Sequence, residues 1–263
     1  MNSSKHFGVK AKKHLGQHFL KNTNAANQTA LAASETGCKN ILEIGPGTGV
    51  LTLPLLNHFA NPLLCELDLE SVHFLQADAR FASCRILSAD VLSLDFSTLF
   101  AGQAFCVVGN FPYNISSQIV FKIIENRALV HAMVGMFQKE VAERICSKPG
   151  SKVYGVISVL TQAFYATELL FTLPPEDFEP APEVHSAVIR LRLKPEPHPL
   201  ASSPLFSKLV KTAFSQRRKK LRNALSVFSL PDSHPFAGKR AEELSVDDFL
   251  ELLAFLMPNL ETK

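Results

Sequence analysis

The chain has 263 residues, of which 46% are hydrophobic and 19% are charged, and its formal net charge is +3. This balance is typical of a folded globular protein and excludes an intrinsically disordered chain. A net charge of +3 is too small to indicate nucleic-acid binding by itself, so the distribution of the basic residues matters more than their sum.

Short apolar runs alternate with amphipathic segments over the first three quarters of the chain, after a basic arm that ends near residue 21. The expected strands are Ile41–Ile44, Pro62–Cys65, Arg85–Leu87, Phe105–Val108, Met133–Phe137 and Ala187–Leu193. The expected helices are Gln28–Ser34, Ser71–Gln76, Ser117–Glu125 and Lys139–Cys146. Such alternation is typical of an α/β fold in which a doubly wound, mainly parallel sheet is covered by helices.

A proline-rich segment, Lys194–Pro199, interrupts this pattern, because its three prolines cannot continue a strand or a helix. The segments that follow have helical patterns, and they are Ser207–Phe214, Arg217–Val227, Ala241–Leu244 and Val246–Leu256. The sequence therefore predicts two domains, an α/β domain over residues 1–197 and a small all-helical domain over residues 198–263.

A glycine-rich stretch, Leu42–Thr52, follows the first expected strand. Gly45, Gly47 and Gly49 let the backbone turn tightly and approach a ligand without a Cβ atom in the way. A plain tight turn is the alternative, but three glycines at alternate positions make it the weaker interpretation. A loop of this kind at the carboxyl end of a strand predicts a nucleotide-type cofactor, with Gly45 and Gly47 beside it.

Two acidic residues at the ends of the next strands extend this prediction. Glu66 lies about twenty residues beyond the glycines, where an acidic side chain commonly binds ribose hydroxyls. Val50 stands where the third glycine of a dinucleotide site would be, which favours S-adenosyl-L-methionine over NAD, since the former has no pyrophosphate. Asp90 is a candidate acceptor for the amine of the cofactor's adenine. Asp68 is either part of this site or a solvated loop charge.

The segment Gly109–Ser116 contains the tetrad Asn110-Phe111-Pro112-Tyr113. An [N/D]-x-P-[Y/F] tetrad after a strand marks methyltransferases that act on amino groups of planar nitrogen systems, including adenine N6. The N6 lone pair is delocalised into the ring, so the carbonyls of Asn110 and Pro112 are expected to accept the two N6 hydrogens and free that lone pair. Tyr113 offers an aromatic face to the base. A helix-initiating turn is the alternative, which the upstream signals disfavour.

Phe178 lies in a proline-rich loop, Pro174–Pro182, before the last expected strand. It is a candidate second stacking face opposite Tyr113. The alternative, a buried anchor of the loop, is equally favoured by the sequence.

Basic residues are concentrated after Arg190. Between Arg190 and Arg222 there are ten basic residues against one acid, Glu196. The densest run predicts phosphate contacts and comprises Arg217, Arg218, Lys219, Lys220 and Arg222. The arm adds a second basic patch, which comprises Lys10, Lys12, Lys13, His14, His18 and Lys21. A solvated helix face is the alternative interpretation for the run.

The odd number of cysteines and their spacing do not suit a disulfide framework or a zinc site, so no metal is predicted. The five are Cys38, Cys65, Cys84, Cys106 and Cys146. The first residues, Met1–His6, lack the apolar core of a secretory signal, and no apolar run reaches the length of a membrane span. We therefore expect a cytoplasmic protein with reduced thiols and no membrane partner.

Over nearly its whole length the chain resembles the 16S ribosomal RNA adenine N6-dimethyltransferases. The matching stretches are Lys13–Leu20, Leu42–Thr52, Glu66–Asp68, Asp90, Asn110–Ser116, Gln138–Arg144, Ser151–Gly155, Phe178–Leu191 and Ala213–Lys219. The ordered set is specific, although each motif alone is not. Phe111 departs from the usual leucine and Asn22 from a frequent aspartate, and the first departure is expected to affect the rim of the pocket.

The resemblance implies a Rossmann-like class I methyltransferase fold. It also implies transfer of two methyl groups to each of two adjacent adenines near the 3′ end of small-subunit RNA, during assembly of the 30S particle. By the same resemblance, His18 and Leu20 would close over the cofactor, and Gly45, Glu66 and Asp90 would contact it together with Asn110. A monomer is expected.

Three other interpretations stay open at this point. The erythromycin-resistance methyltransferases share the catalytic loop but act on large-subunit RNA, and the run after Phe214 is not expected in them. A DNA adenine methyltransferase would normally carry a larger sequence-reading domain. A ribosome-assembly factor could keep this fold without activity, but the intact glycine loop and Asn110–Tyr113 argue against lost catalysis.

Overall fold

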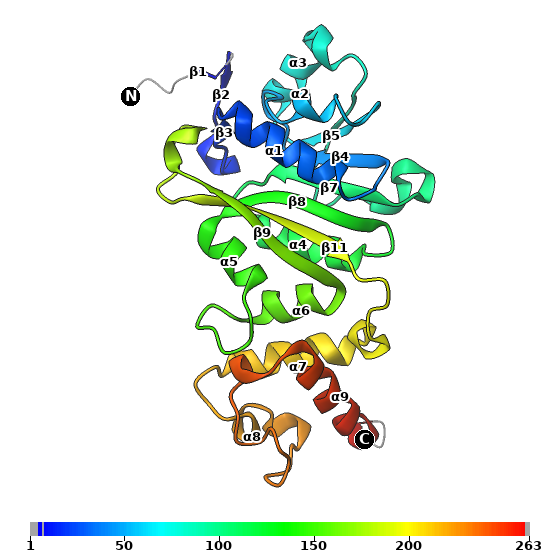
Figure 1. The fold of residues 1–263 in the computed structure, drawn as a ribbon, viewed down its shortest axis with the longest axis vertical. Helices are drawn as coiled ribbons and strands as arrows, with labels where there is room; N and C mark the ends of the chain where they lie inside the picture. Colours follow the sequence, from blue (N-terminus) through cyan, green and yellow to red (C-terminus); the bar gives the residue numbers. More distant parts are fainter. Residues whose placement is uncertain (1–4, 7, 261–263) are drawn as a thin grey trace. The chain divides into compact units, whose positions relative to one another are not determined.

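The computed structural model describes residues 5–6 and 8–260, so most of Met1–His6, on which the expected lack of a secretory signal rests, lies outside it. The chain divides into two compact units (Figure 1). One unit takes its residues from Met1–Ala142 and Thr167–Leu193, and the other from Glu143–Ala166 and Lys194–Lys263. This division differs from the predicted boundary after residue 197, because residues 143–166 group with the C-terminal helices. As a boundary between independently folding domains, residue 197 stays a prediction.

The first unit is built on a sheet with the strand order β6-β5-β4-β7-β8-β11-β9 among the described residues. The strands are β4 Asn40–Ile44, β5 Leu63–Glu66, β6 Arg85–Ser88, β7 Phe105–Asn110, β8 Val130–Gln138, β9 Tyr165–Leu173 and β11 Ser186–Leu193. Neighbours from β6 through β8 run parallel, and β11 runs antiparallel to β8. This arrangement confirms the predicted mainly parallel sheet.

Helices cover the sheet, and in the described chain four short strands form two separate two-stranded sheets. The helices assigned to this part are α1 Thr23–Ser34, α2 Thr52–Leu55, α3 Leu69–Ala77, α4 Ser116–Glu125 and α5 Lys139–Cys146, the last of which continues into the second unit. The short strands are β1 Lys5–His6, β2 Val9–Lys10, β3 Phe19–Leu20 and β10 Phe178–Glu179, and they pair as β1-β2 and β10-β3. Helix α1 packs on the sheet through small, fully buried residues such as Ala26, Ala30 and Ala33, whose spacing places them on one helix face.

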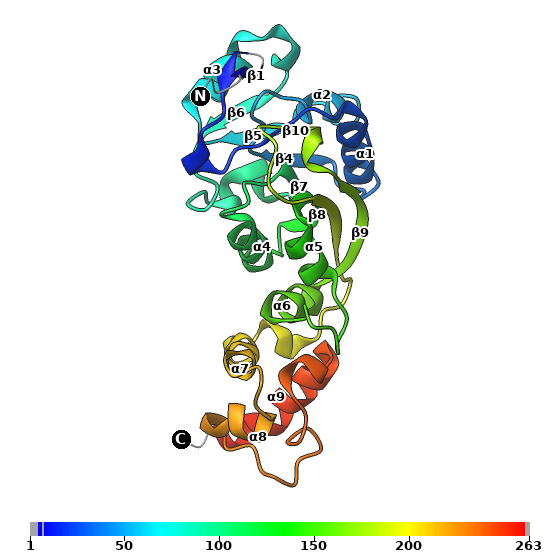
Figure 2. The same cartoon turned by 90° about the vertical axis from the view of Figure 1, so that its left-hand side faces the viewer.

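The strand order reverses between β4 and β7 (Figure 2). The chain builds outward from β4 to β6 and then returns to place β7 on the other side of β4, so the loops after β4 and β7 emerge side by side. Gly109 permits this close approach, because a Cβ atom there would lie 2.4 Å from the carbonyl oxygen of Ile44. The glycine-rich loop and the Asn110 loop therefore meet at one edge of the sheet.

The second unit is helical. Its helices are α6 Val156–Phe164, α7 Pro204–Ser215, α8 Leu221–Ala224 and α9 Val246–Leu260, joined by the 3-10 turns Pro199–Ser202, Ser226–Phe228 and Ala241–Glu243. Phe214 on α7 contacts the rings of Tyr154 and Phe249, at centroid distances of 6.2 and 6.0 Å. In the described part of the chain, no helix is both long and apolar enough to cross a bilayer.

One predicted helix differs from the structure, and one strand of the large sheet was not predicted. The helix predicted over Arg217–Val227 is much shorter, since Gln216 ends α7 with a non-helical backbone (φ −123°, ψ 52°), residues 217–220 are not helical, and α8 covers only Leu221–Ala224. The strand β9 was not predicted. Its buried and exposed residues do not alternate regularly, so it lacks the pattern of a half-buried strand. None of the five cysteines forms a disulfide with another in the described chain.

Candidate functional site

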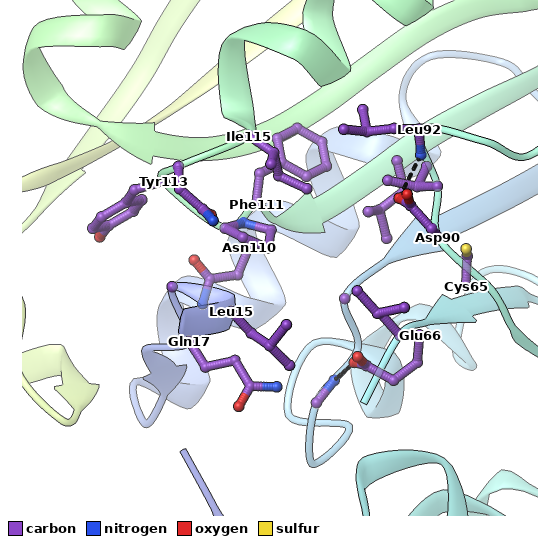
Figure 3. A pocket seen from close by; sticks show the side chains of 18 of the residues that line it. Leu15, Gln17, Cys65, Glu66, Asp90, Leu92, Asn110, Phe111, Tyr113 and Ile115 are labelled. Atoms are coloured by element: carbon purple, nitrogen blue, oxygen red, sulfur yellow. Dashed lines mark hydrogen bonds between the residues drawn. The ribbon is translucent and has the colours of Figure 1, made fainter. Parts of the chain in front are cut away.

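A cavity of about 200 Å³ opens at the edge of the sheet where the strand order reverses (Figure 3). Its walls come from the arm, the glycine-rich loop and the ends of β5, β6 and β7. Of the residues predicted for the site, those that line the cavity are His18, Gly45, Gly47, Glu66, Asp90, Asn110, Pro112 and Tyr113. Leu20 and Phe178 do not line it.

The Glu66 carboxylate holds the glycine-rich loop in place. Its Oε2 accepts a hydrogen bond from the backbone N–H of Gly47 at 3.0 Å, and its Oε1 accepts one from the N–H of Asp68 at 2.8 Å. Glu66 is only 5% exposed, and burial raises its pKa above the ordinary value. Gly47 has φ +55°, and a Cβ atom there would lie 2.9 Å from the Phe19 ring. The loop conformation therefore depends on both Glu66 and the glycine.

Asp90 follows β6 and also organises its own turn. Its Oδ1 accepts a hydrogen bond from the N–H of Leu92 at 2.8 Å, and its Oδ2 accepts one from the Ser93 hydroxyl at 3.2 Å. Asp90 therefore stabilises its own turn, as aspartate commonly does, and this does not exclude a ligand role. Asp90 is half-buried at the wall of the cavity, and each carboxylate oxygen can accept a further hydrogen bond.

Asn110 is oriented by the arm. Its side-chain Nδ2 donates a hydrogen bond to the backbone carbonyl of His18 at 2.7 Å. A carbonyl oxygen only accepts, so this contact sets which end of the amide faces the arm. The Oδ1 atom has no hydrogen-bond partner among the described residues, and it is left as an acceptor at the cavity. The Pro112 carbonyl already accepts a hydrogen bond from the N–H of Ile115 at 3.2 Å, which leaves it one lone pair.

Tyr113 is fixed at its hydroxyl and covered on its ring. The hydroxyl lies 2.6 Å from the Ser186 Oγ, and burial raises the pKa of the phenol. The His18 ring stacks on the Tyr113 ring at a centroid distance of 5.3 Å and an interplanar angle of 24°. The Nδ1 atom of His18 lies 2.7 Å from the carbonyl oxygen of Pro180. His18 therefore occupies a face of the ring that was predicted to receive a base.

The arm is attached to the sheet through Asp68, a contact that the sequence did not reveal. Lys12 forms an ion pair with Asp68, and Gln17 donates to the same carboxylate at 3.3 Å. Asp68 also accepts the N–H of Glu70 at 3.1 Å and so caps α3. Burial acts to raise the pKa of Asp68, but the hydrogen bonds from Lys12 and Gln17 hold it below its ordinary value. Asp68 is thus not a solvated loop charge.

Phe178 and Leu20 lie elsewhere than predicted. Strand β10 pairs antiparallel with β3, which places Phe178 opposite Leu20, and both side chains are buried in the core beside α1. Adjacent strand residues point to opposite sides, so Phe19 faces the cavity while Leu20 faces the core. Phe178 is 1% exposed. The prediction of a second stacking face is therefore wrong for this structure, and the buried-anchor interpretation describes it.

Phe111, the departure from the family's usual leucine, is accommodated by a glycine. Its ring is buried and contacts the Phe137 ring edge-on at a centroid distance of 5.1 Å. A Cβ atom on Gly135 would lie 2.2 Å from this ring, so β8 leaves the room that the larger side chain needs. Phe111 reaches the cavity wall without closing the cavity.

Some of the predicted basic residues already have partners within the protein, and others are exposed without an acidic partner in the described chain. Arg217 donates to the Lys152 carbonyl, and Arg222 lies 3.7 Å from Asp232. Arg190 bridges Glu35 and Glu168 at 2.7 Å each, so it belongs to the fold of the first unit. The exposed residues of the run that have no acidic partner in the described chain are Arg218, Lys219 and Lys220. In the arm, Lys12 and Lys21 already have acidic partners.

Glu43, in β4 beneath the glycine loop, is a buried carboxyl group that the sequence did not single out. It is 1% exposed and accepts a hydrogen bond from the Thr52 hydroxyl at 2.7 Å. Burial raises its pKa to about 8, from an ordinary value of 4.5. The group is therefore protonated in the folded protein at neutral pH, although it is ionised in the unfolded chain.

Because Glu43 keeps its proton in the folded protein, we expect the free energy of unfolding to depend on pH. Between pH 4.5 and about 8 the folded state keeps a proton that the unfolded state has lost, so the Glu43 contribution to stability falls as pH rises. The slope is up to about 1.4 kcal/mol per pH unit. We expect Glu43→Gln to gain stability relative to the parent chain from pH 5.5 to 8.5, measured by urea unfolding. Parallel profiles would contradict this, and the exposed Glu125→Gln serves as the matched control.

Comparison with known proteins gives a consistent result at the level of sequence. The model of the family described as ribosomal RNA adenine dimethylase matches residues 8–256. The ribosomal RNA small subunit methyltransferase A of Flavobacterium johnsoniae is 48% identical over 247 residues, which cover 93% of this chain and 95% of the relative. The protein of the same name from Parabacteroides distasonis is 45% identical over 257 residues and covers 96% of each chain.

Solved structures agree on the fold. A dimethyladenosine transferase from Plasmodium falciparum has a TM-score of 0.77 at 24% identity, covering 92% of this chain and 98% of that one. The 23S rRNA methyltransferase ErmE has a TM-score of 0.69 at 21% identity, covering 90% and 99%. At these identities the likeness concerns the fold alone, and it confirms the predicted class I methyltransferase architecture.

Proposed function

This chain belongs to the ribosomal RNA adenine dimethylase family, and we propose that it transfers methyl groups from S-adenosyl-L-methionine to the N6 amine of adenines in small-subunit ribosomal RNA. The names of its relatives support the small subunit as the source of the substrate. The proposal extends to two methyl groups on each of two adjacent adenosines near the 3′ end, added by a single chain to the assembling 30S particle. The observation that carries the chemistry is the free Asn110 acceptor beside Tyr113, in the same cavity as Glu66 and Asp90.

The donor set of the cavity suits the proposed cofactor. Gly45 and Gly47 leave the backbone bare along one wall, where a Cβ atom on Gly47 would already collide with Phe19. Glu66 supplies a buried acceptor suited to ribose hydroxyls, and Asp90 supplies an acceptor suited to an adenine amine. When bound, S-adenosyl-L-methionine would supply a methyl group made electrophilic by its positively charged sulfur. The arm residues His18 and Phe19 would shield the cavity from water.

The chain's own residues prepare the amine. The Asn110 Oδ1 accepts one N6 hydrogen, and the remaining lone pair of the Pro112 carbonyl accepts the other. These bonds favour the pyramidal amine, whose lone pair is no longer shared with the ring and is directed at the methyl group. Because the groups are held before the substrate arrives, alignment and electrostatics account for most of the rate.

The base must first reach Tyr113. An adenine in folded RNA has to be extruded before it enters a pocket of this kind. His18 covers one face of the Tyr113 ring, so the base either replaces the imidazole or stacks on the opposite face. His18 also anchors Asn110 through its carbonyl and contacts Pro180 through its ring. Entry of the base and the position of the arm are thereby coupled through one residue.

The deciding experiment follows labelled methyl groups to their nucleoside. The purified protein is incubated with radiolabelled S-adenosyl-L-methionine and unmethylated small-subunit particles, with large-subunit RNA and DNA in parallel. We expect N6,N6-dimethyladenosine from the small-subunit particles alone. Label in large-subunit RNA would instead indicate an enzyme of the erythromycin-resistance type. No label in any substrate, with cofactor still bound, would favour an assembly factor without activity.

The exposed run after α7 is proposed to contact RNA phosphates, and Arg217, Arg218, Lys219, Lys220 and Arg222 form it. Replacing the three residues that lack an acidic partner, Arg218, Lys219 and Lys220, with Ala is expected to weaken RNA binding. The plot of log affinity against log salt should become shallower by about 2 to 3, because binding with three fewer phosphate contacts releases fewer counterions. Filter binding from 50 to 300 mM KCl measures the slope. An unchanged slope, equal to that of the control Lys39→Ala, would place the RNA surface elsewhere.

A further inference from the structure

A second cavity, of about 330 Å³, lies beside the glycine-rich loop. It is formed by the end of the arm, the first turns of α1, the loop, α2 and Arg80, and it shares no lining residue with the first cavity. We propose that this cavity is a subsite for a nucleotide of the RNA strand that flanks the methylated adenine. The inference rests on the proposed function, because the second cavity would bind a part of the same RNA substrate that the first cavity does not hold.

The charge of this second cavity suits a phosphate. Lys21 and Arg80 line it, their side chains are 42% and 53% exposed, and no acidic residue is among the lining residues. Asp78 accepts from the Nε and Nη2 atoms of Arg80, which holds the guanidinium in place and leaves Nη1 for another acceptor. Lys21 is only loosely engaged, since its Nζ lies 3.8 Å from Glu179. A phosphate oxygen between these two cations would be held by charge-assisted hydrogen bonds.

Two amides and an apolar wall suit the rest of a nucleotide. Asn27 and Asn57 are exposed at the cavity, and within the described chain neither side-chain amide has a hydrogen-bond partner. Each amide offers a donor and an acceptor, the combination that reads the edges of unpaired bases. Leu53 and Pro54 of α2 supply an apolar surface for a sugar or a base face. An inorganic phosphate would use only the cations and leave this surface bare.

The Thr48 hydroxyl is an unpaired polar group at the wall of this cavity. Thr48 lines the second cavity and a third, smaller one, it is 4% exposed, and its buried hydroxyl has no hydrogen-bond partner among the described residues. Buried hydroxyls are normally satisfied, so this one is a polar group that a ligand bound beside it could engage.

The position of the second cavity relates it to the target base. His18 and Phe19 line the first cavity, and Lys21 on the same extended arm lines the second. At about 3.3 Å per residue of extended chain, the three steps from His18 to Lys21 span about 10 Å. A stacked strand advances about 3.4 Å per nucleotide, so the bound nucleotide lies within about three positions of the methylated adenine.

The test pairs variants of the protein with shortened substrates. The KM and kcat of wild type, of the double variant Asn27→Ala/Asn57→Ala and of the control Lys39→Ala are measured on RNAs shortened stepwise on each side of the target adenine. On the full RNA we expect the double variant to raise KM about tenfold at unchanged kcat, because two hydrogen bonds are lost. Once the docked nucleotide is removed, wild type and variant should have the same KM. An equal defect at every length, or none on the full RNA, overturns the subsite.

A binding measurement separates this result from failure of the proposed function. Adenosine 5′-monophosphate and uridine 5′-monophosphate are titrated into the full chain saturated with S-adenosylhomocysteine, and the backbone amides are followed by NMR. Saturable shifts at Thr48 and Leu53, which both line the cavity and are kept in the double variant, support the subsite if they disappear in that variant, even if no RNA is methylated. Absence of those shifts in the parent chain, or their persistence in a double variant that thermal unfolding shows to be folded, overturns the subsite whatever the activity.

Discussion

Asn110→Ala is expected to lower kcat by about 10²- to 10³-fold, the loss typical of removing one preorganised hydrogen-bonding group at a reacting centre. Asn110 Oδ1 is the acceptor that has no partner among the described residues, so the variant loses the group that draws one hydrogen away from the amine. The half-buried position at the end of β7 supports no core packing, and the melting temperature should change little. Single-turnover methylation of small-subunit particles measures the chemical step without product release.

Asn110→Asp is the matched control for this prediction. It keeps side-chain acceptors but cannot donate to the His18 carbonyl, which anchors the arm. We therefore expect Asn110→Asp to retain more of the single-turnover rate than Asn110→Ala, while both weaken the attachment of the arm. Wild-type turnover in Asn110→Ala, or equal loss in the two variants, would show that Oδ1 does not act on the amine. Cofactor affinity is measured separately, because Asn110 also lines the cofactor cavity.

Glu66→Ala is expected to raise the Kd for the cofactor about 100-fold, close to 3 kcal/mol, since a buried ionic acceptor contributes about 1.5–3 kcal/mol per hydrogen bond. The variant also leaves the N–H groups of Gly47 and Asp68 without the carboxylate that now accepts from them. The glycine-rich loop should consequently lose order as well as a ligand. Isothermal titration with S-adenosylhomocysteine measures the affinity without any need for activity.

Two comparisons make this second prediction specific. Glu66→Gln keeps one oxygen acceptor and nearly the same volume, so its Kd should lie between those of wild type and Glu66→Ala. Asp90→Ala should have the smaller effect, because Asp90 is half-exposed and its contacts are mainly within its own turn. If Asp90→Ala weakens binding more than Glu66→Ala, the ribose acceptor has been assigned to the wrong carboxylate.

The arm that covers the cavity is held by contacts at several separate points. Lys12 and Gln17 bind Asp68, the His18 carbonyl accepts from Asn110, and Phe19 pairs within the β3–β10 ribbon. Leu20 anchors the end of the arm in the core beside α1, whereas residues 12–18 are held by polar contacts that each contribute little net free energy. The polar segment over residues 12–18 can therefore close the cavity and still release when a base must enter, while Leu20 stays in the core.

The sequence by itself determined the features that depend on local order along the chain. Three local patterns predicted strands: one before Gly45–Gly49, one ending at Glu66 and one leading into Asn110. All three strands are present in the large sheet. Parallel strands bring their carboxyl ends to one edge, so three loops far apart in the chain could be assigned to one cavity before any contact was known. The resemblance to a family then restricted the chemistry.

Only the tertiary structure decided which neighbour each side chain meets. Phe178 and Leu20 face the core because β10 pairs with β3 in one register, and a shift of one residue would have exposed them. Asp68 is buried because Lys12 and Gln17, more than fifty residues away, lie over it. Tyr113 is covered by His18 for the same kind of reason. These outcomes depend on pairings between distant segments, and the periodicity of a single segment carries no information about its partner.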